Sequence, residues 1–345
     1  MDDSKDFKRL SLGLRKGSLE DGYDRSPKRS SSFSHLWSPR ISRNRNNLSP
    51  RSDDESSYEI RTPRGSPRTG VLKIKQLEEI GRGASGTVVY KGKIDGAVYC
   101  IKEMGYQDST KKEVKQLMNE IEALRKIPLN SNIVEYVGYQ RIPGKIQIIM
   151  SLYCGSLYDI IQRRKKRKPR HEFTIKQIIH IVSQLFNGLA VLRVRQLMHR
   201  DLKSCNILYD GDPKQIQECM FVIADLGESK VVRKNTKVGT ITGTPGWIAP
   251  EILNQTTDGY TIAADMYSAG MVLYECMTLQ IPMYEYKFAG TATVNGKKPK
   301  LSMHQTSKYA CLLPLYESCT EMDPEKRGTV QDAIRMISVL KEEIK

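Results

Sequence analysis

The spacing of hydrophobic and polar residues divides the chain into three parts. From residue 71 to about 150, short runs rich in β-branched residues alternate with Gly and polar turns such as Asp95-Gly96, which is typical of strands and hairpins. The exception is 111–127, where apolar residues recur every three to four positions and predict a helix. The pattern predicts an α+β fold in which a small β-rich part, about 74–150, precedes a larger part, about 151–345. Helical spacing dominates that larger part, over 178–192 and about 262–280, 308–320 and 328–343.

Residues 1–70 show neither the strand-like runs nor the helical spacing of the rest of the chain. They are rich in Ser, Arg, Asn and Pro and poor in aromatic residues, so they cannot bury enough apolar surface to offset the entropy of ordering, and we expect a disordered basic tail. A phosphate beside Lys or Arg could reverse the local charge of such a tail. The tail carries a repeated Ser/Thr-Pro-Lys/Arg motif, which predicts phosphorylation by a proline-directed kinase; a plain solvated linker is the alternative. The motif begins at Ser26, Ser38, Ser49, Thr62 and Ser66.

Composition and charge limit the classes of protein that remain. The chain of 345 residues is 39% apolar and carries a formal net charge of +16. This charge favours acidic partners, but the tail has too few aromatic residues to favour nucleic acid. The seven cysteines form no Cys-x-x-Cys pair, so neither a zinc site nor a disulfide framework is indicated, and a reducing compartment fits. With no apolar signal segment and no apolar run of roughly 18 residues, we expect a cytoplasmic protein without a membrane span.

A short polar loop, 199–206, lies between two apolar segments and holds three chemically different groups. Asp201 supplies a carboxylate, Lys203 an ammonium group and Asn206 a carboxamide. Phosphoryl transfer needs such a set: a carboxylate to orient the attacking hydroxyl, a cation to offset the charge on the phosphoryl group, and an oxygen ligand for Mg²⁺. Taken alone, the loop could equally be a solvated turn, so the interpretation depends on the rest of the chain.

A glycine-rich stretch lies between two of the predicted strands. In Gly81-x-Gly83-x-x-Gly86-x-Val88, the glycines would let the backbone approach phosphates closely. The stretch alone is a weak signal, because a dinucleotide site would begin a helix here and a Walker loop would continue with Lys-Ser/Thr. The predicted nucleotide-binding residues are Ile80, Gly81, Arg82, Gly83, Ala84, Ser85, Gly86, Thr87 and Val88.

Two further segments offer partners for a phosphate. Lys102 lies in an apolar run, where a buried ammonium group needs an anion, and Glu120 on the next predicted helix is the best carboxylate for it. A snorkelling strand lysine is the alternative. Asp225 ends the apolar strand 221–224 and is followed by Leu226-Gly227, a position from which a carboxylate can chelate Mg²⁺. In isolation, Asp225 could also be a turn residue.

The order of these motifs resembles that of the eukaryotic-type protein kinase family. The matching elements are the Gly-rich loop, the strand Lys, the helix Glu, His-Arg-Asp-Leu-Lys-x-x-Asn, Asp-x-Gly and Ala-Pro-Glu at 249–251. The resemblance covers roughly 74–340 and implies a two-lobed kinase domain at 71–345 with its N-lobe at about 74–150 and its C-lobe at about 151–345. The Lys after His-Arg-Asp-Leu and the segment 243–251 resemble Ser/Thr kinases, and Gly-Trp-Ile-Ala-Pro-Glu is similar to the tyrosine-kinase-like group.

The resemblance also implies a role for each site residue, with ATP and Mg²⁺ as cofactors and Ser/Thr residues of proteins as acceptors. Asp201 would be the catalytic base and Lys203 would contact the γ-phosphate. Lys102 would bind the α- and β-phosphates and pair with Glu120. Asn206 and Asp225 would hold Mg²⁺, and Thr244, in the substrate groove, would hydrogen-bond the Asp201–Lys203 pair. Scaffold roles follow for Asp265, which would brace the catalytic loop, and for Arg327, which would pair with Glu251.

Arg200, beside the predicted base, is similar to the Arg of kinases that are switched on by activation-loop phosphorylation, which implies an upstream kinase. Thr240 is the first choice of acceptor because of its distance from Thr244. The other candidates are Thr236, Thr242 and Ser229. Cys100 replaces the usual Ala before the strand lysine, which we interpret as a steric change near the adenine pocket, and Met150 is the expected gate of that pocket.

Two other classes of function remain as alternatives. A pseudokinase would bind without catalysis, but the predicted Lys102, Asp201 and Asp225 are all present. The tail could instead tether the chain to an anionic surface or nucleic acid. The basic run 163–170 is expected in an exposed loop, as a solvated face, a nuclear-import signal or a docking site for an acidic partner. A nuclear location in addition to the cytoplasm is therefore included in the expectation.

Overall fold

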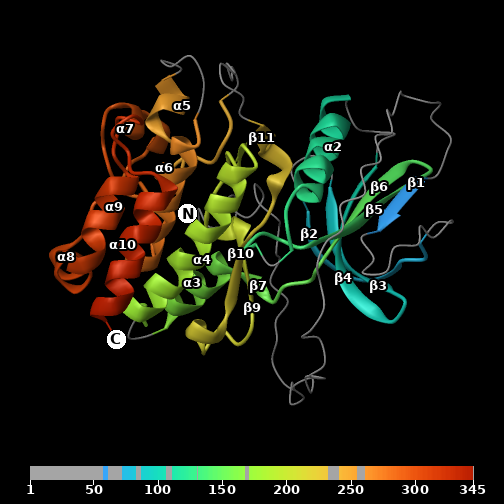
Figure 1. Ribbon diagram of the computed structural model, residues 1–345, viewed down its shortest axis with the longest axis horizontal. Helices are drawn as coiled ribbons and strands as arrows, with labels where there is room; N and C mark the ends of the chain where they lie inside the picture. Colours follow the sequence, from blue (N-terminus) through green and yellow to red (C-terminus); the bar gives the residue numbers. More distant parts are fainter. Residues whose placement is uncertain are drawn as a thin grey trace.

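The computed structural model describes residues 57–60, 72–82, 87–105, 111–129, 131–167, 171–231, 241–254 and 261–344. They form two lobes, with a sheet and helix α2 on one side and helices α3 to α10 on the other (Figure 1). The chain passes from the first lobe to the second directly after strand β6, near residue 150. The predicted α+β fold and the change from strands to helices at this point are confirmed.

The smaller lobe is built on an antiparallel sheet with the strand order β1-β5-β6-β4-β3-β2. Asp95 and Gly96 have φ angles of 47° and 90°, as the predicted tight hairpin between β3 and β4 requires. Helix α2 (Lys111–Arg125) turns its apolar stripe to the core and is the predicted helix of this lobe. The strands are β1 (Ser57–Ile60), β2 (Lys75–Arg82), β3 (Val88–Ile94), β4 (Ala97–Gly105), β5 (Tyr136–Ile142) and β6 (Lys145–Met150).

Strand β1 comes from the segment for which we expected disorder. Its backbone pairs with β5, with Tyr58 opposite Gln140 and Ile60 opposite Gly138. A second attachment follows at Leu72, whose N–H donates to Gln140 Oε1 at 2.9 Å and whose carbonyl accepts from Gln140 Nε2 at 3.3 Å. The expectation for 1–70 is therefore wrong at Ser57–Ile60. The other residues of the predicted tail, with its Ser/Thr-Pro sites, lie outside the described residues.

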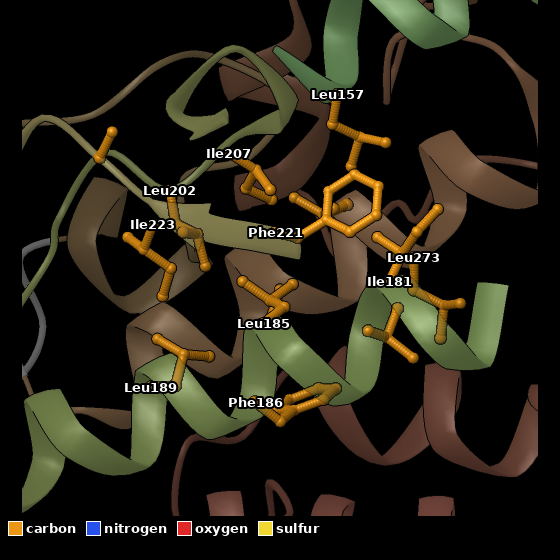
Figure 2. Packing of buried hydrophobic residues seen from close by; sticks show 14 of the residues in the cluster. Leu157, Ile181, Leu185, Phe186, Leu189, Leu202, Ile207, Phe221, Ile223 and Leu273 are labelled. Carbon is orange, nitrogen blue, oxygen red and sulfur yellow. The ribbon is translucent and has the colours of Figure 1, made fainter. Parts of the chain in front are cut away.

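The larger lobe is organised around two helices, α4 (Ile175–Val194), which is buried along one face, and α6 (Ala263–Thr278), which is buried along almost its whole length. Figure 2 shows Ile181, Leu185 and Leu189 of α4 packed beneath the strand that carries Phe221 and Ile223. Helix α4 begins at a capping box in which Thr174 and Gln177 each bond the other's backbone N–H. The remaining helices are α3 (Leu157–Lys166), α5 (Pro250–Asn254), α7 (Ala289–Val294), α8 (Met303–Lys308), α9 (Leu313–Cys319) and α10 (Val330–Glu343).

By length and composition alone, α4 could cross a membrane. More than half of its apolar window is buried inside the lobe, where it packs against α6, α10 and β10. A core helix passes the same test for this reason, and the finding is weak evidence for a span.

Short strands and single 3₁₀ turns connect the longer helices, and among them β8, η2 and β10 pack against α4. Strands β7, β9 and β10 form one small sheet, and β8 pairs with β11 in another. Together they hold the polar loop 199–206 and the segment around Asp225 at the side of the lobe that faces the sheet. Their bounds are β7 (Gly155–Ser156), β8 (Leu197–Met198), η1 (Ser204–Asn206), β9 (Ile207–Asp210), η2 (Ile216–Glu218), β10 (Met220–Ile223), η3 (Leu226–Glu228), β11 (Lys230–Val231) and η4 (Ala310–Leu312).

Gly188 lets α4 lie directly against the strand above it. A Cβ at this position would stand 2.7 Å from the carbonyl oxygen of Asn132 and 2.8 Å from Ile223 Cδ1. We expect Gly188→Ala to lower the free energy of unfolding by about 1–3 kcal/mol, measured by urea denaturation, because the helix must shift. Gly290→Ala is the control, since the same methyl group there meets nothing closer than 3.9 Å. Equal midpoints for the two variants would contradict the tight packing of Gly188.

Candidate active site

The polar loop 199–206 is held from below by a buried carboxylate of α6. Asp265 accepts hydrogen bonds from the backbone N–H groups of His199 at 2.7 Å and Arg200 at 3.0 Å. His199 also bonds the carbonyl of Ala224 through Nε2 at 2.9 Å, which links the loop to the strand before Asp225. Arg200 has a φ of 73°, in the left-handed region that non-glycine residues seldom adopt. The expected bracing of this loop by Asp265 is present.

Asp201, Lys203 and Thr244 form a closed triangle of hydrogen bonds. Lys203 Nζ donates to Asp201 Oδ2 and to Thr244 Oγ1, both at 2.7 Å, and Thr244 Oγ1 donates to Asp201 Oδ1 at 2.6 Å. The expected contact of Thr244 with this pair is therefore present. Lys203 is buried and Asp201 keeps 15% of its side chain exposed. A carboxylate whose position is fixed and whose rim is open to solvent can receive a proton from a bound hydroxyl.

Lys102 meets two carboxylates, that of Glu120, which was expected as its partner, and that of Asp225. Its Nζ lies 2.8 and 2.7 Å from the carboxylate oxygens of Glu120 and 3.0 Å from Asp225 Oδ1. The three residues come from β4, from α2 and from the second position after β10, so this cluster joins the two lobes. The expected Lys102–Glu120 ion pair is present, and Asp225 is its third member.

Burial and charge oppose each other in this cluster. Burial lowers the pKa of Lys102, but Asp225 and Glu120 outweigh it, and the pKa is raised well above its usual value. Burial raises the pKa of Asp225, but Lys102 outweighs this and the net direction is downward. For Glu120, burial dominates and the pKa is raised despite Lys102. The ammonium group therefore stays charged and holds the Asp225 carboxylate ionised beside it.

Asn206 and Asp225 provide oxygen atoms that suit a divalent cation. Asn206 Nδ2 donates to the carbonyl of Asp201 at 2.8 Å, which turns its Oδ1 away from the loop. Within the described part of the chain, this Oδ1 is buried and has no hydrogen-bond partner. A buried amide oxygen of this kind normally has one. Carboxylate and amide oxygens are the ligands that Mg²⁺ prefers, so the two residues fit the predicted metal site.

An apolar pocket of about 670 Å³, open at its mouth, reaches from Lys102 and Asp225 to the segment that joins the lobes. Its lining includes Ile80, one of the predicted nucleotide-binding residues. It also includes Cys100, which was expected near the adenine pocket, and Met150, the expected gate of that pocket. The other lining residues are Val89, Glu120, Val134, Ser151, Leu152, Tyr153, Gly155, Leu208 and Ala224. Such a pocket, with a cation at one end and apolar walls at the other, matches the base and phosphates of a nucleotide.

The predicted nucleotide-binding stretch agrees with the structure only in part. Val89, opposite Lys102 in the β3–β4 ladder, lines the pocket, whereas Val88 packs against the cluster on the outer face of the sheet. The choice of Val88 is therefore wrong, because alternate residues of a strand face opposite sides. The Arg82 side chain is exposed and pairs with Glu79 at 2.7 Å. Gly81 is buried in β2 and Thr87 is buried before β3, while Gly83, Ala84, Ser85 and Gly86 lie outside the described residues.

The predicted phosphate acceptors divide between described and undescribed residues. Thr242 is half-buried, two residues before Thr244, and Ser229 is half-buried after η3. Thr236 and Thr240 lie outside the described residues. Further away, Arg327 and Glu251 form the expected pair, with two N–O contacts at 2.7 and 3.0 Å in a buried setting.

The basic run begins in a helix and not in the expected loop. Its first residues form the last turn of α3, and two of them are fixed by the fold. Arg164 is buried over the Phe173 ring, 4.0 Å from its centroid, and donates to the carbonyls of His171 and Glu172. Arg163 donates to Tyr209 Oη at 2.8 Å. The expectation of a fully exposed run is therefore wrong for Arg164, and residues 168–170 lie outside the described residues.

The sequence matches the family model of the protein kinase domain over residues 74–337. The chain belongs to the protein kinase family. Among the relatives of this kinase, pakH of Dictyostelium discoideum, a serine/threonine-protein kinase, is 32% identical over 263 residues, which are 75% of this chain and 48% of that protein. Serine/threonine-protein kinase PAK 1 of Mus musculus is 30% identical over 299 residues, or 82% of this chain and 49% of that protein.

A Raf homolog serine/threonine-protein kinase of Caenorhabditis elegans is 29% identical over 270 residues, which cover 75% of this chain and 32% of that protein. The kinase spans less than half the length of each of these three relatives. Their names cover more than one kinase group, so they support the family and leave the group within it open. The fold is that of a protein kinase, with a β-rich N-lobe and a helical C-lobe.

Proposed function

We propose that this chain is a protein serine/threonine kinase that transfers the γ-phosphate of Mg-ATP to Ser or Thr residues of proteins. The observation that carries the proposal is that the two lobes bring Lys102, Glu120 and Asp225 together at one end of the pocket. The relatives named as serine/threonine-protein kinases support the choice of acceptor. A pseudokinase is disfavoured because every predicted catalytic group is present and is held in place by hydrogen bonds to other site residues.

In the proposed reaction, the acceptor hydroxyl oxygen bonds to the γ-phosphorus while the bond to the leaving ADP oxygen breaks. Asp201 orients the hydroxyl and takes its proton, since its carboxylate is fixed by Lys203 and Thr244 but open to solvent. Lys203 offsets negative charge on the phosphoryl group, and Lys102 holds the α- and β-phosphates while Glu120 holds Lys102. Asn206 and Asp225 would hold Mg²⁺, which supplies positive charge to the phosphates when it is bound.

Three finer parts of the proposal concern group, control and location. The Gly-Trp-Ile-Ala-Pro-Glu segment at 246–251 and the Raf homolog among the relatives favour the tyrosine-kinase-like group. Arg200 beside Asp201 favours control by phosphorylation of the activation loop, at Thr240 first and Thr242 or Thr236 next, through an upstream kinase. We place the protein in the cytoplasm and, in part, in the nucleus, with its tail a substrate of a proline-directed kinase.

The first test is a phosphosite map of the purified chain after incubation with Mg-ATP and a generic acceptor protein. We expect phosphate on Ser and Thr residues only, on Thr240 or Thr242 as well as on the acceptor, and none after Mg²⁺ is removed with a chelator. Phosphate on tyrosine would contradict the proposed acceptor class. No transfer to either protein, even after treatment with a cell extract that contains upstream kinases, would support the pseudokinase.

A further inference from the structure

Strand β1 is an element of the N-lobe that the proposed reaction does not use. It extends the sheet at the edge formed by β5, and it consists of the four residues Ser57–Ile60 (Figure 1). A strand this short, paired along one side, is held by few hydrogen bonds, so we expect it to open far more readily than the core of the lobe. Such an element has two states, docked and undocked, and a ligand that prefers one of them shifts the balance.

The register of the sheet places β1 in line with the proposed nucleotide site. Residues that lie directly opposite one another on neighbouring strands form a row across the sheet, and the row that begins at Glu59 of β1 passes through Lys102 and ends at Gly81. The members of this row are Glu59, Tyr139, Ile148, Lys102, Val89 and Gly81. Strand β1 therefore docks at one end of the row that holds the phosphate-binding lysine and the start of the glycine-rich stretch.

The neighbouring row connects β1 to β4 through polar side chains. Gln140 lies opposite Tyr58, and its Nε2 donates to Gln147 Oε1. Gln147 Nε2 in turn donates to Glu103 Oε2 at 2.6 Å. Gln140 and Gln147 are both buried, where an amide group is costly unless its polar atoms are hydrogen-bonded. Because Glu103 directly follows Lys102 in β4, a chain of hydrogen bonds runs from the partner of β1 to the residue beside Lys102.

Gln140 also holds the start of the strand that leads into the glycine-rich stretch. Its amide group bonds both the N–H and the carbonyl of Leu72, three residues before β2. Ile74 lies over Gly92 of β3, where an added Cβ would stand only 2.8 Å from Ile74 Cγ2. The β2–β3 ladder that follows contains register shifts, so the position of Gly81 depends on how the start of β2 is held. Gln140 is therefore the residue at which β1, β4 and the start of β2 are joined.

We propose that β1 is a regulatory strand whose docking on β5 is coupled to nucleotide binding. The docked strand fixes Gln140, and Gln140 fixes both β4 beside Lys102 and the start of β2. When β1 undocks, Gln140 loses the backbone that pairs with it, and both connections loosen together. The inference rests on the nucleotide site of the proposed kinase and adds a control element to it. Because a coupling free energy acts equally in both directions, a nucleotide that prefers the docked form also holds β1 in place.

The first test compares two double variants of the full chain by their Kd for Mg-ADP. Tyr58→Pro with Glu59→Pro removes two successive backbone N–H groups, one of which must donate to β5, because every second residue of an antiparallel strand is hydrogen-bonded to its partner. Tyr58→Ala with Glu59→Ala removes the same side chains and keeps both N–H groups, so it is the matched control. The Pro variant should raise Kd about fivefold and the Ala variant less than about twofold. Equal Kd values for the two variants would overturn the proposal.

The second test uses the wild type and does not depend on the folding of a variant. Hydrogen exchange of a peptide that contains Ser57–Ile60 is followed by mass spectrometry with and without saturating Mg-ADP. By reciprocity, the nucleotide should slow this exchange by the same factor of about five. Helix α8 is the internal reference, because it lies in the other lobe, has no buried residues and should exchange at an unchanged rate. An unchanged rate at Ser57–Ile60, or equal slowing at α8, would overturn the coupling.

Failure of this inference and failure of the kinase function give different results. A wild-type chain that does not bind Mg-ADP contradicts the proposed kinase function, and the coupling falls with it. A wild-type chain that binds Mg-ADP while the exchange of Ser57–Ile60 stays unchanged refutes the role of β1 alone.

Discussion

Asp201→Asn is expected to lower the rate of phosphoryl transfer by about 10³-fold while leaving the fold and nucleotide binding intact. Asn cannot take the proton of the acceptor hydroxyl, which is the role proposed for Asp201. It can still accept from Lys203 through its oxygen and donate to Thr244 Oγ1 through its nitrogen, so the triangle of hydrogen bonds survives. The loss should appear in kcat, with the melting temperature and its shift by Mg-ATP close to wild type.

Asp212→Asn is the matched control for this variant. Asp212 is exposed, and the hydrogen bond from the Lys214 N–H to its Oδ1 is one that an Asn oxygen can accept equally well. Its kinetics should equal those of the wild type. An Asp201→Asn chain that keeps more than a tenth of wild-type kcat would show that the base is another group.

Lys102→Met should be the most destabilising of the substitutions discussed, and it should also abolish activity. The change leaves the buried Glu120 and the half-buried Asp225 next to each other without their shared cation. Removing one partner of a buried ion pair costs about 3–5 kcal/mol, because the remaining charge is uncompensated. The free energy of unfolding, from urea denaturation at pH 7.5, should fall by this amount.

The loss of unfolding free energy in Lys102→Met should depend on pH, and the direction of this dependence identifies the cause of the loss. Without the ammonium group, burial raises the folded-state pKa values of both carboxyl groups above those of the unfolded chain. The folded variant then binds more protons than the unfolded one, so its stability falls as pH rises above about 4. In the wild type, the pKa of Lys102 is raised, so its ammonium group stays charged at these pH values. This charge stabilises the ionised carboxylates and opposes the loss of stability with rising pH.

Urea denaturation of wild type and variant at pH 5 and pH 8 measures this effect. The difference in unfolding free energy between the two chains should be clearly larger at pH 8. The control is Lys91→Met, which breaks an exposed pair with Glu78 and should cost less than about 1 kcal/mol at either pH. A deficit of Lys102→Met that is the same at both pH values would mean that lost packing, rather than unpaired charge, destabilises the variant.

The residues of the site could be predicted because their chemistry is visible in the chain. Lys102 is a charged residue in an apolar run and Asp225 ends one, so each needed a partner, and the spacing of α2 pointed to Glu120. Asp201, Lys203 and Asn206 lie within six positions, so the sequence itself keeps them together. The order of the motifs then placed all of them in one family.

The features that were predicted wrongly depend on contacts between distant segments, which the spacing of residues in the sequence does not reveal. Val88 and Val89 are alike, and only the register of β3 against β4, next to an irregular β2–β3 ladder, decides which one faces the pocket. Arg164 belongs to a charge run, and its burial depends on Phe173, from the segment that follows α3.

Strand β1 has a practical consequence for anyone who wishes to isolate the catalytic unit. The family match begins at residue 74, but the sheet of the N-lobe begins at Ser57 and is fastened again at Leu72. A fragment cut at residue 74 would present the bare edge of β5, with a row of unpaired N–H and C=O groups that can recruit a strand from another molecule. Self-association of such a fragment would be an artefact of the cut, and a recombinant catalytic unit should start upstream of Ser57.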